Sequence, residues 1–256
     1  MNPTNYLMRR VAWWMEQTRF LFFPRKLSPS DLIFLEKYFT FYNRLNLRHK
    51  KEFLVKLEMI LSSKKFVARG GLEEVTSEME VLISATIAMV TFGWKRLRLA
   101  HFHTILVYPN AYYSTSNKTY HRGEVNPKFG IIVVSWRCFV DGFLDEKDGV
   151  NLGIHEIAHA LKLANQIESD GEKEFEPQAW KAYKSLVPTE IEKVRSGENS
   201  IFRDAALLNE HEFFAVAMEN FFERPWEFYN SRMELYEALV RLMRLDPRVW
   251  EKPTSG

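Results

Sequence analysis

The stretch GVNLGIHEIAHALKLAN, residues 149–165, combines apolar residues at helical spacing with two histidines four positions apart. Residues four apart lie one above the other on an α-helix, so His155 and His159 project from the same side. Both rings can therefore direct a nitrogen at one ion, which predicts a metal site on a helix. The apolar residues of the stretch predict that this helix is well buried: Val150, Leu152, Ile154, Ile157, Ala158 and Leu161.

The residue after the first histidine suggests what such a metal would do. In an H-E-x-x-H helix, the position of Glu156 suits a base that takes a proton from metal-bound water rather than a ligand. Zinc binds neutral imidazole, and a catalytic zinc takes three protein ligands and leaves a position for water. Manganese and cobalt stay open, with zinc preferred for this ligand set. The alternative is a core helix whose histidines are satisfied by hydrogen bonds, and the cost of burying unpartnered polar groups makes it the weaker interpretation.

A second apolar helix, within LLNEHEFFAVAMENFFERP at residues 207–225, offers the third ligand. Glu212 and Glu219 lie on one face of it. We predict that Glu212 binds the metal and that Glu219 accepts the N–H of a ligand histidine, as neighbouring groups in zinc sites commonly do. The competing ligands Glu210 and His211 are turned away by about 100° per residue.

Both acids also have structural interpretations. Asn209 and Glu212 match an N-x-x-E capping box, in which the carboxylate only bonds the backbone at the helix start. Glu219 could instead be solvated or form a salt bridge. These alternatives stay open at the level of sequence.

The rest of the chain predicts a mostly helical α+β protein with a small mixed β-sheet flanking the histidine helix. Helical spacing predicts one helix within 27–45, with its start signal at Pro29, and further helices within 49–66 and 76–93. Runs of β-branched and aromatic residues predict strands over 102–109 and 130–136, separated by loop-like sequence with a short strand. Helices follow over 150–165, about 173–195 and 210–223, with a continuation to about 244. We expect one domain over 1–256, divided into a basic and aromatic extension at 1–28, a helical part at 29–100, the strands and histidine helix at 101–165, and a helical part with the third ligand at 166–256.

Composition narrows the functional classes. The 35 basic and 33 acidic residues leave a net charge of +2, which gives no argument for nucleic-acid binding. Cys138 is the only cysteine, so there is no internal disulfide and no sign of an oxidising compartment. Charges interrupt the aromatic N-terminus, so no transmembrane segment is expected there, and it packs on the protein, on a partner or on a membrane surface. A cytoplasmic location is the expectation.

Several motifs together resemble the Mlc titration factor A family of zinc-dependent peptidases, which are zincins with glutamate as the third ligand. Between about residues 50 and 230 the chain contains, in the family's order, ILVYPNAYYS, Gly123-Glu124, IIVVSW, GVNLGIHEIAHAL and EFFAVAMENFFERP. The resemblance implies a zincin-like fold and one zinc ion per chain. It also implies that His155, His159 and Glu212 bind this zinc and that Glu156 is the catalytic base.

One position departs from the family. Relatives tend to have a tyrosine seven residues before the third ligand, suited to stabilising the oxyanion, whereas this chain has Ala205. Either another donor replaces it or activity is reduced. The unranked candidates for this donor are Tyr113, Tyr120, His121 and Tyr183.

The expected activity is hydrolysis of peptide bonds by a metal-activated water with Glu156 as general base, and an aminopeptidase falls within this expectation. GIIVVSW could supply an edge strand for a peptide or protein substrate, with Ser135 and Trp136 as substrate-binding candidates, although its apolar run also fits an internal strand. An alternative is a regulatory module that retains structural zinc and binds a transcriptional regulator, as the family name implies. A third possibility is hydrolysis of a non-peptide amide.

Overall fold

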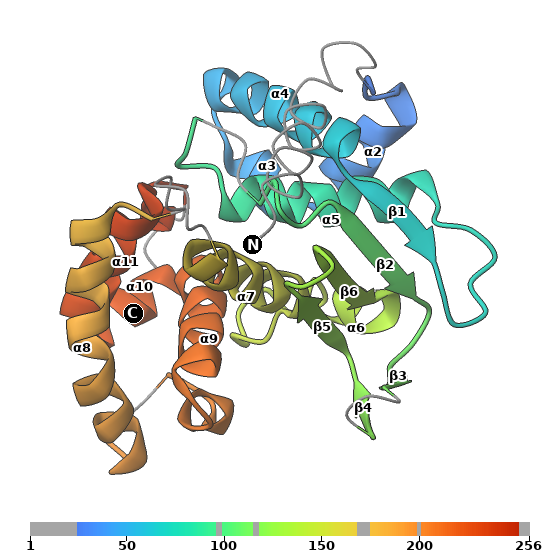
Figure 1. Cartoon of the computed structure of the whole chain (residues 1–256). Helices are drawn as coiled ribbons and strands as arrows, with labels where there is room; N and C mark the ends of the chain where they lie inside the picture. The colour runs from blue at the N-terminus through green and yellow to red at the C-terminus, as the bar shows by residue number, and fades with distance from the viewer. Residues whose placement is uncertain (1–24, 96–98, 115–117, 168–174, 199–200, 251–256) are drawn as a thin grey trace, which may run out of the picture.

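The computed structural model describes residues 25–95, 99–114, 118–167, 175–198 and 201–250, and it alternates helices with two small sheets (Figure 1). The expected N-terminal extension lies outside these residues from 1 to 24, so its contacts stay a prediction. The mostly helical α+β class with a small mixed sheet is confirmed.

Four helices open the described chain: α2 (Pro29–Tyr38), α3 (Thr40–Arg44), α4 (Leu47–Ser63) and α5 (Ser77–Val90). The prediction of one helix over 27–45 was wrong, because Phe39 leaves the helical conformation with φ −118° and ψ 84°. Its buried ring packs on Phe53 and Phe143 and separates α2 from α3. Helix α5 is apolar on most sides and is buried throughout from Val81 to Val90, so it forms the centre of the core.

The larger sheet has the strand order β1-β2-β6-β5. Strands β1 (Lys65–Ala68), β2 (Thr104–Tyr108) and β6 (Ile131–Ser135) are parallel, and β5 (Gly123–Asn126) is antiparallel to β6. The proposed edge strand at 130–136 was therefore a wrong prediction: β6 is an inner strand, as its continuous apolar run allows. The edge strand next to β6 is β5. Strand β1 was not predicted.

A two-stranded antiparallel sheet, β3 (Tyr112–Ser114) and β4 (Thr119–His121), precedes β5. After β6 the chain is helical again. The remaining elements are α6 (Trp136–Asp141), α7 (Leu152–Ile167), α8 (Pro177–Arg195), the 3-10 helix η1 (Asp204–Leu207), α9 (Glu210–Glu223), α10 (Pro225–Ser231), α11 (Met233–Met243) and the 3-10 helix η2 (Pro247–Trp250).

Helix α7 lies between the sheet and the C-terminal helices (Figure 1). It packs against β5 and β6 on one side, against α5 in the core, and most extensively against α9. This arrangement brings the histidines of α7 to the helix that carries the two acids. No helix of the described segments is long and apolar enough to cross a lipid bilayer.

Candidate metal centre

The start of α7 is fixed by a buried asparagine. Asn151 accepts a hydrogen bond from the backbone N–H of Ile154 at 3.0 Å, so it satisfies a donor that the helix start leaves unpaired. Its Nδ2 donates to the Gly142 carbonyl and to Glu223 Oε1 at 2.9 and 3.0 Å. Asn151 thus joins the α6–α7 connection to α9. These contacts fix the orientation of α7 about its axis at a position four residues before His155.

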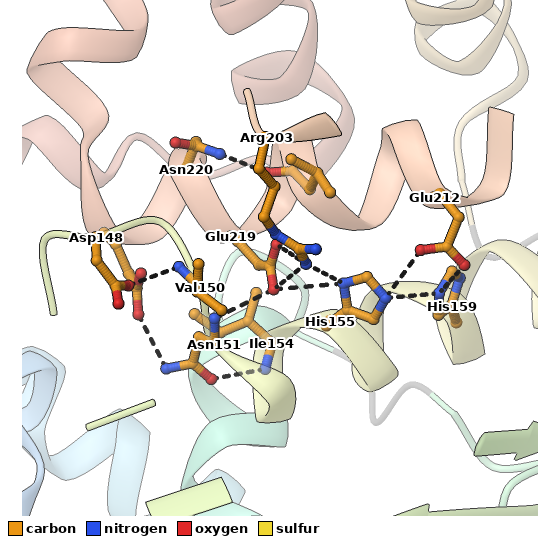
Figure 2. A network of polar contacts seen from close by, with 12 residues as sticks. Asp148, Val150, Asn151, Ile154, His155, His159, Arg203, Glu212, Glu219 and Asn220 are labelled. Carbon is orange, nitrogen blue, oxygen red and sulfur yellow. Dashed lines mark hydrogen bonds and ion pairs between the residues drawn. The ribbon is translucent and has the colours of Figure 1, made fainter. Parts of the chain in front are cut away.

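One turn later, the two histidines of α7 meet a carboxylate from α9. The Nε2 atoms of His155 and His159 lie 3.0 Å apart, and the ring planes are nearly perpendicular at 86°. The carboxylate of Glu212 faces both of them, with Oε2 at 3.2 Å from His155 Nε2 and Oε1 at 3.3 Å from His159 Nε2 (Figure 2). Within the described ranges, these three residues are the only group of histidines, cysteines or acids arranged to hold a metal ion.

These separations fit a metal ion at the centre. Ligand atoms at about 2.0–2.1 Å from a tetrahedral zinc lie about 3.3 Å from one another. The observed 3.0, 3.2 and 3.3 Å are close to this spacing. Two imidazole nitrogens and a carboxylate oxygen are also a donor set that zinc accepts.

The charges of these groups depend on one another. Burial opposes a charge on His155, but the carboxylates of Glu212 and Glu219 outweigh it and raise its pKa to about 9. Hydrogen bonds from His155 and His159 hold the pKa of Glu212 well below its ordinary value. Glu212 therefore presents a charged carboxylate to the site.

Glu212 is not the capping group of its helix. The side chain of Asn209 caps α9 by accepting from the backbone N–H groups of His211 and Glu212 at 2.8 and 3.0 Å. The Glu212 carboxylate faces the histidines instead. The competing acid Glu210 is exposed, and neither it nor His211 belongs to the metal-holding group.

A second carboxylate of α9 lies behind the first histidine. Glu219 is 1% exposed, and its Oε1 lies 3.4 Å from His155 Nδ1. The backbone N–H of Asn151 donates to the same oxygen at 3.1 Å. Glu219 also forms a salt bridge with Arg203 at 2.8 Å. The sequence left a salt bridge open for this acid but did not identify Arg203 as its partner. Figure 2 shows the His155 ring with Glu219 and Arg203 at one nitrogen and His159 and Glu212 at the other.

The candidate base, Glu156, is 5% exposed and faces the edge of the sheet. A Cβ added to Gly123 of β5 would lie 2.4 Å from Glu156 Oε1, so only glycine leaves room for this carboxyl group. Burial raises the pKa of Glu156 to about 7, and the nearby acids add to this effect although His155 opposes it.

The edge strand brings a second polar pair near this carboxyl group. Tyr112 of β3 donates to Glu124 of β5 at 3.0 Å. Burial raises the pKa of Tyr112, and the charges of Glu124 and Glu156 raise it further. The sequence contained Gly123-Glu124 as part of a family motif, but it gave no signal that Tyr112 would join them, because the contact depends on how the β3–β4 hairpin folds.

The predicted substrate-binding residues lie in the chain after β6. Ser135 is fully buried and accepts from the backbone N–H of Cys138 as the cap of α6, which is at odds with substrate contact. Trp136 stacks on Phe139 with centroids 5.5 Å apart, so its contact with substrate stays a prediction.

The candidates for the oxyanion donor are scattered. Tyr113 and Tyr120 are exposed and contact each other across the β3–β4 hairpin. His121 stacks on Tyr112, and Tyr183 is buried among the aromatic rings around α8. Ala205 lies half-buried in η1. His121 does not belong to the metal-holding group, and which of the four donates to an oxyanion stays a prediction.

An α+β fold in which a histidine helix meets a glutamate from a second helix defines a zincin-like protein. Comparison with known proteins specifies the family: residues 11–244 match the glucose-regulated metallo-peptidase M90 family. The chain belongs to this family, which implies that it binds a metal.

Named relatives cover most of the chain. A protein of Synechocystis sp., slr2042, is 24% identical over 251 residues, which are 92% of this chain and 91% of the relative. Mlc titration factor A of Salmonella arizonae is 30% identical over 214 residues, covering 74% and 81% of the two chains. Mlc titration factor A of Yersinia enterocolitica is 24% identical over 218 residues, covering 77% and 80%.

Proposed function

We propose that this chain is a zinc-dependent peptidase in which His155, His159 and Glu212 hold the ion and Glu156 is the general base. The observation that carries the proposal is the spacing of the three ligand atoms, 3.0–3.3 Å apart, beside a buried carboxyl group. Zinc in such a site lowers the pKa of a bound water towards 7 and polarises a carbonyl group.

Glu156 suits a group that both accepts and donates a proton. A carboxyl group with a pKa of about 7 is present in both forms near neutral pH. It can therefore take the proton of the attacking water and deliver it to the amine that leaves. Among the described residues the neighbouring strand β5 is the edge of the sheet, so the backbone groups on its outer side can offer hydrogen bonds to an extended peptide.

The same proposal includes the cleavage specificity, the protein substrate or partner, and the cellular compartment. An aminopeptidase specificity requires that cleavage be lost when the N-terminus of a peptide is acetylated. The relatives named as titration factors of Mlc support a transcriptional regulator as the protein substrate or partner. The single cysteine, Cys138, which is free, supports a reducing compartment such as the cytoplasm.

The decisive experiment compares the wild type with Glu156→Gln, which keeps the size of the side chain and removes its basicity. Metal content is measured by mass spectrometry and cleavage is followed on a mixed peptide library, after reloading with zinc, manganese or cobalt. We expect one zinc per chain in both proteins and activity about 10²–10⁴-fold lower in the variant, the usual contribution of a general base.

The other outcomes identify the competing functions. Stoichiometric zinc with equal and negligible turnover in both proteins would contradict a peptidase and support a regulatory binding module. Cleavage of small amides but of no peptide would support the non-peptide hydrolase. A wild-type protein that binds no divalent ion would overturn the metal site itself.

A further inference from the structure

Arg203, the residue that precedes η1, carries a contact that the proposed reaction does not use. Its Nη2 donates to both carboxylate oxygens of Glu219, at 3.0 and 2.8 Å, and lies 3.3 Å from His155 Nδ1 (Figure 2). The side chain is 36% exposed, whereas that of Glu219 is 1% exposed. A cation at the protein surface thus reaches a buried carboxylate directly behind a metal ligand.

The guanidinium is held in this place in spite of an unsatisfied donor. Arg203 Nε is buried and has no hydrogen-bond partner in the described parts of the chain. A buried N–H without a partner is unfavourable, so such groups are rare and call for an explanation. The contacts that Nη2 makes with Glu219 explain why the side chain takes this position although Nε is unsatisfied.

The geometry at His155 limits what those contacts can be. For Nε2 to offer its lone pair to a metal ion, the hydrogen of the neutral ring must be on Nδ1. The nearest acceptor is Glu219 Oε1 at 3.4 Å. Arg203 is a donor only, so its 3.3 Å approach to Nδ1 cannot be a hydrogen bond in this tautomer. The hydrogen bond must run from the histidine to Glu219.

We infer that Arg203 is a positioning residue for the metal centre: it orients the Glu219 carboxylate so that Oε1 accepts the His155 Nδ1–H and Nε2 faces the ion. This inference rests on the proposed metal site. One nitrogen that spans both oxygens fixes the plane of the carboxylate, and the N–H of Asn151 fixes Oε1 from a second direction. Without Arg203 the buried carboxylate would lose its cationic partner and the donor that contacts both of its oxygens, while the Asn151 N–H would hold only Oε1.

The test measures zinc affinity by competition with a chelator, using the full chain. Arg203→Met removes the donor and keeps much of the side-chain length, and we expect zinc affinity to fall about 10–100-fold, as for other groups that orient zinc ligands. Arg203→Lys keeps the charge but replaces the rigid guanidinium with an ammonium on a flexible stem, which fixes the carboxylate less firmly, so its zinc affinity should be intermediate. It also keeps the test valid if Arg203→Met folds poorly.

Arg232→Met is the matched control. Arg232 forms ion pairs with Glu190 at 3.2 Å and Glu198 at 3.0 Å, and neither acid belongs to the group at the metal position. We expect this variant to lower the melting temperature and to leave zinc affinity within about twofold of the wild type, since breaking a buried pair destabilises a fold without affecting a remote ligand. A loss of zinc affinity equal to that in Arg203→Met would mean that Arg203 acts only through stability.

A spectroscopic measurement separates orientation from charge. In the zinc-loaded wild type, NMR should show a slowly exchanging Nδ1–H on His155, and Arg203→Met should weaken or remove this signal. Unchanged zinc affinity and an unchanged Nδ1–H signal in Arg203→Met would overturn the inference and leave the metal site intact. A wild type that binds no zinc would overturn both proposals.

Discussion

The two ends of the contact between α7 and α9 use glutamates in different ways. At one end the Glu212 side chain is 25% exposed and faces the Nε2 atoms of His155 and His159. At the other end Glu223 is 6% exposed and accepts a hydrogen bond from Asn151 at 3.0 Å. We call the first the ligand end of the contact, after the role proposed for Glu212, and the second the fastening end, because Asn151 joins the two helices there.

Their protonation differs for a physical reason. Hydrogen bonds from two imidazoles lower the pKa of Glu212, whereas burial raises the pKa of Glu223 to about 8 against weaker hydrogen bonding. Burial at Glu223 and the imidazole partners at Glu212, and not the helix that both acids share, decide whether each acid carries charge. Charge and partial exposure suit ion binding, and a buried neutral acid suits the joining of two helices.

The largest effect is expected from a substitution at the ligand end. Glu212→Ala removes one of the three proposed ligands, so zinc affinity should fall by more than the roughly 100-fold upper range seen for groups that only orient ligands. Chelator competition measures it, and the melting temperature of the metal-free protein should change little. Glu210→Ala, which removes an exposed neighbour, is the control and should bind zinc like the wild type. Full zinc binding by Glu212→Ala would rule out the third ligand.

A smaller effect is expected from crowding the base while leaving the ligands untouched. Gly123→Ala places a methyl group 2.4 Å from the present position of Glu156 Oε1, so the carboxyl group must move. Misplacement by about 1 Å reduces catalysis by up to about 100-fold, and we expect kcat to fall about 10–100-fold. Steady-state kinetics at constant zinc content measures this. An unchanged kcat would show that the Glu156 position is not critical.

Breaking the fastening end should affect stability first. Asn151→Ala removes a helix cap and buried hydrogen bonds, with an expected loss of about 2–4 kcal/mol in the free energy of unfolding. Thermal unfolding of the metal-free protein should show a decrease of about 5–15 °C. A stable variant with lost zinc affinity would contradict the division into two ends.

The smallest effect is expected in the pH dependence of stability, through the carboxyl group of Glu223. Burial raises the pKa of Glu223 from 4.5 to about 8, so the folded state holds this proton more tightly than the unfolded state does. Its contribution to stability is therefore present below about pH 4.5 and is lost as the pH rises to about 8. Glu223→Gln should flatten this decline and raise the melting temperature at pH 9 by a few degrees relative to the wild type. Parallel curves between pH 5 and 9 would contradict the raised pKa.

Periodicity predicted the elements better than it predicted their neighbours. The apolar spacing around α5, α7 and α9 placed these helices correctly, because a buried face leaves a repeat of 3.6 residues. It did not predict the break at Phe39, which depends on packing against rings far along the chain. Nor did it distinguish an inner strand from an edge strand at β6, because that depends on whether β5 pairs beside it.

For the site, too, the sequence predicted local features but not contacts between distant residues. The spacing of His155 and His159 and the shared face of Glu212 and Glu219 are local properties of two helices. Asn151 and Arg203 were not found as partners of Glu219, because hydrogen bonds across 68 and 16 residues leave no pattern along the chain. The division of the chain into parts, with one domain over 1–256, stays a prediction.

The sequence by itself determined that two imidazoles share one side of a buried helix with a glutamate beside them, since helical geometry converts a spacing of four into proximity. Only the tertiary structure decided that α9 delivers Glu212 to within 3.3 Å of both rings, that Glu219 and Arg203 lie behind the first of them, and that β5 forms the edge near Glu156. Those contacts come from packing between distant segments, where many arrangements satisfy the same local pattern and the shape of the core selects one.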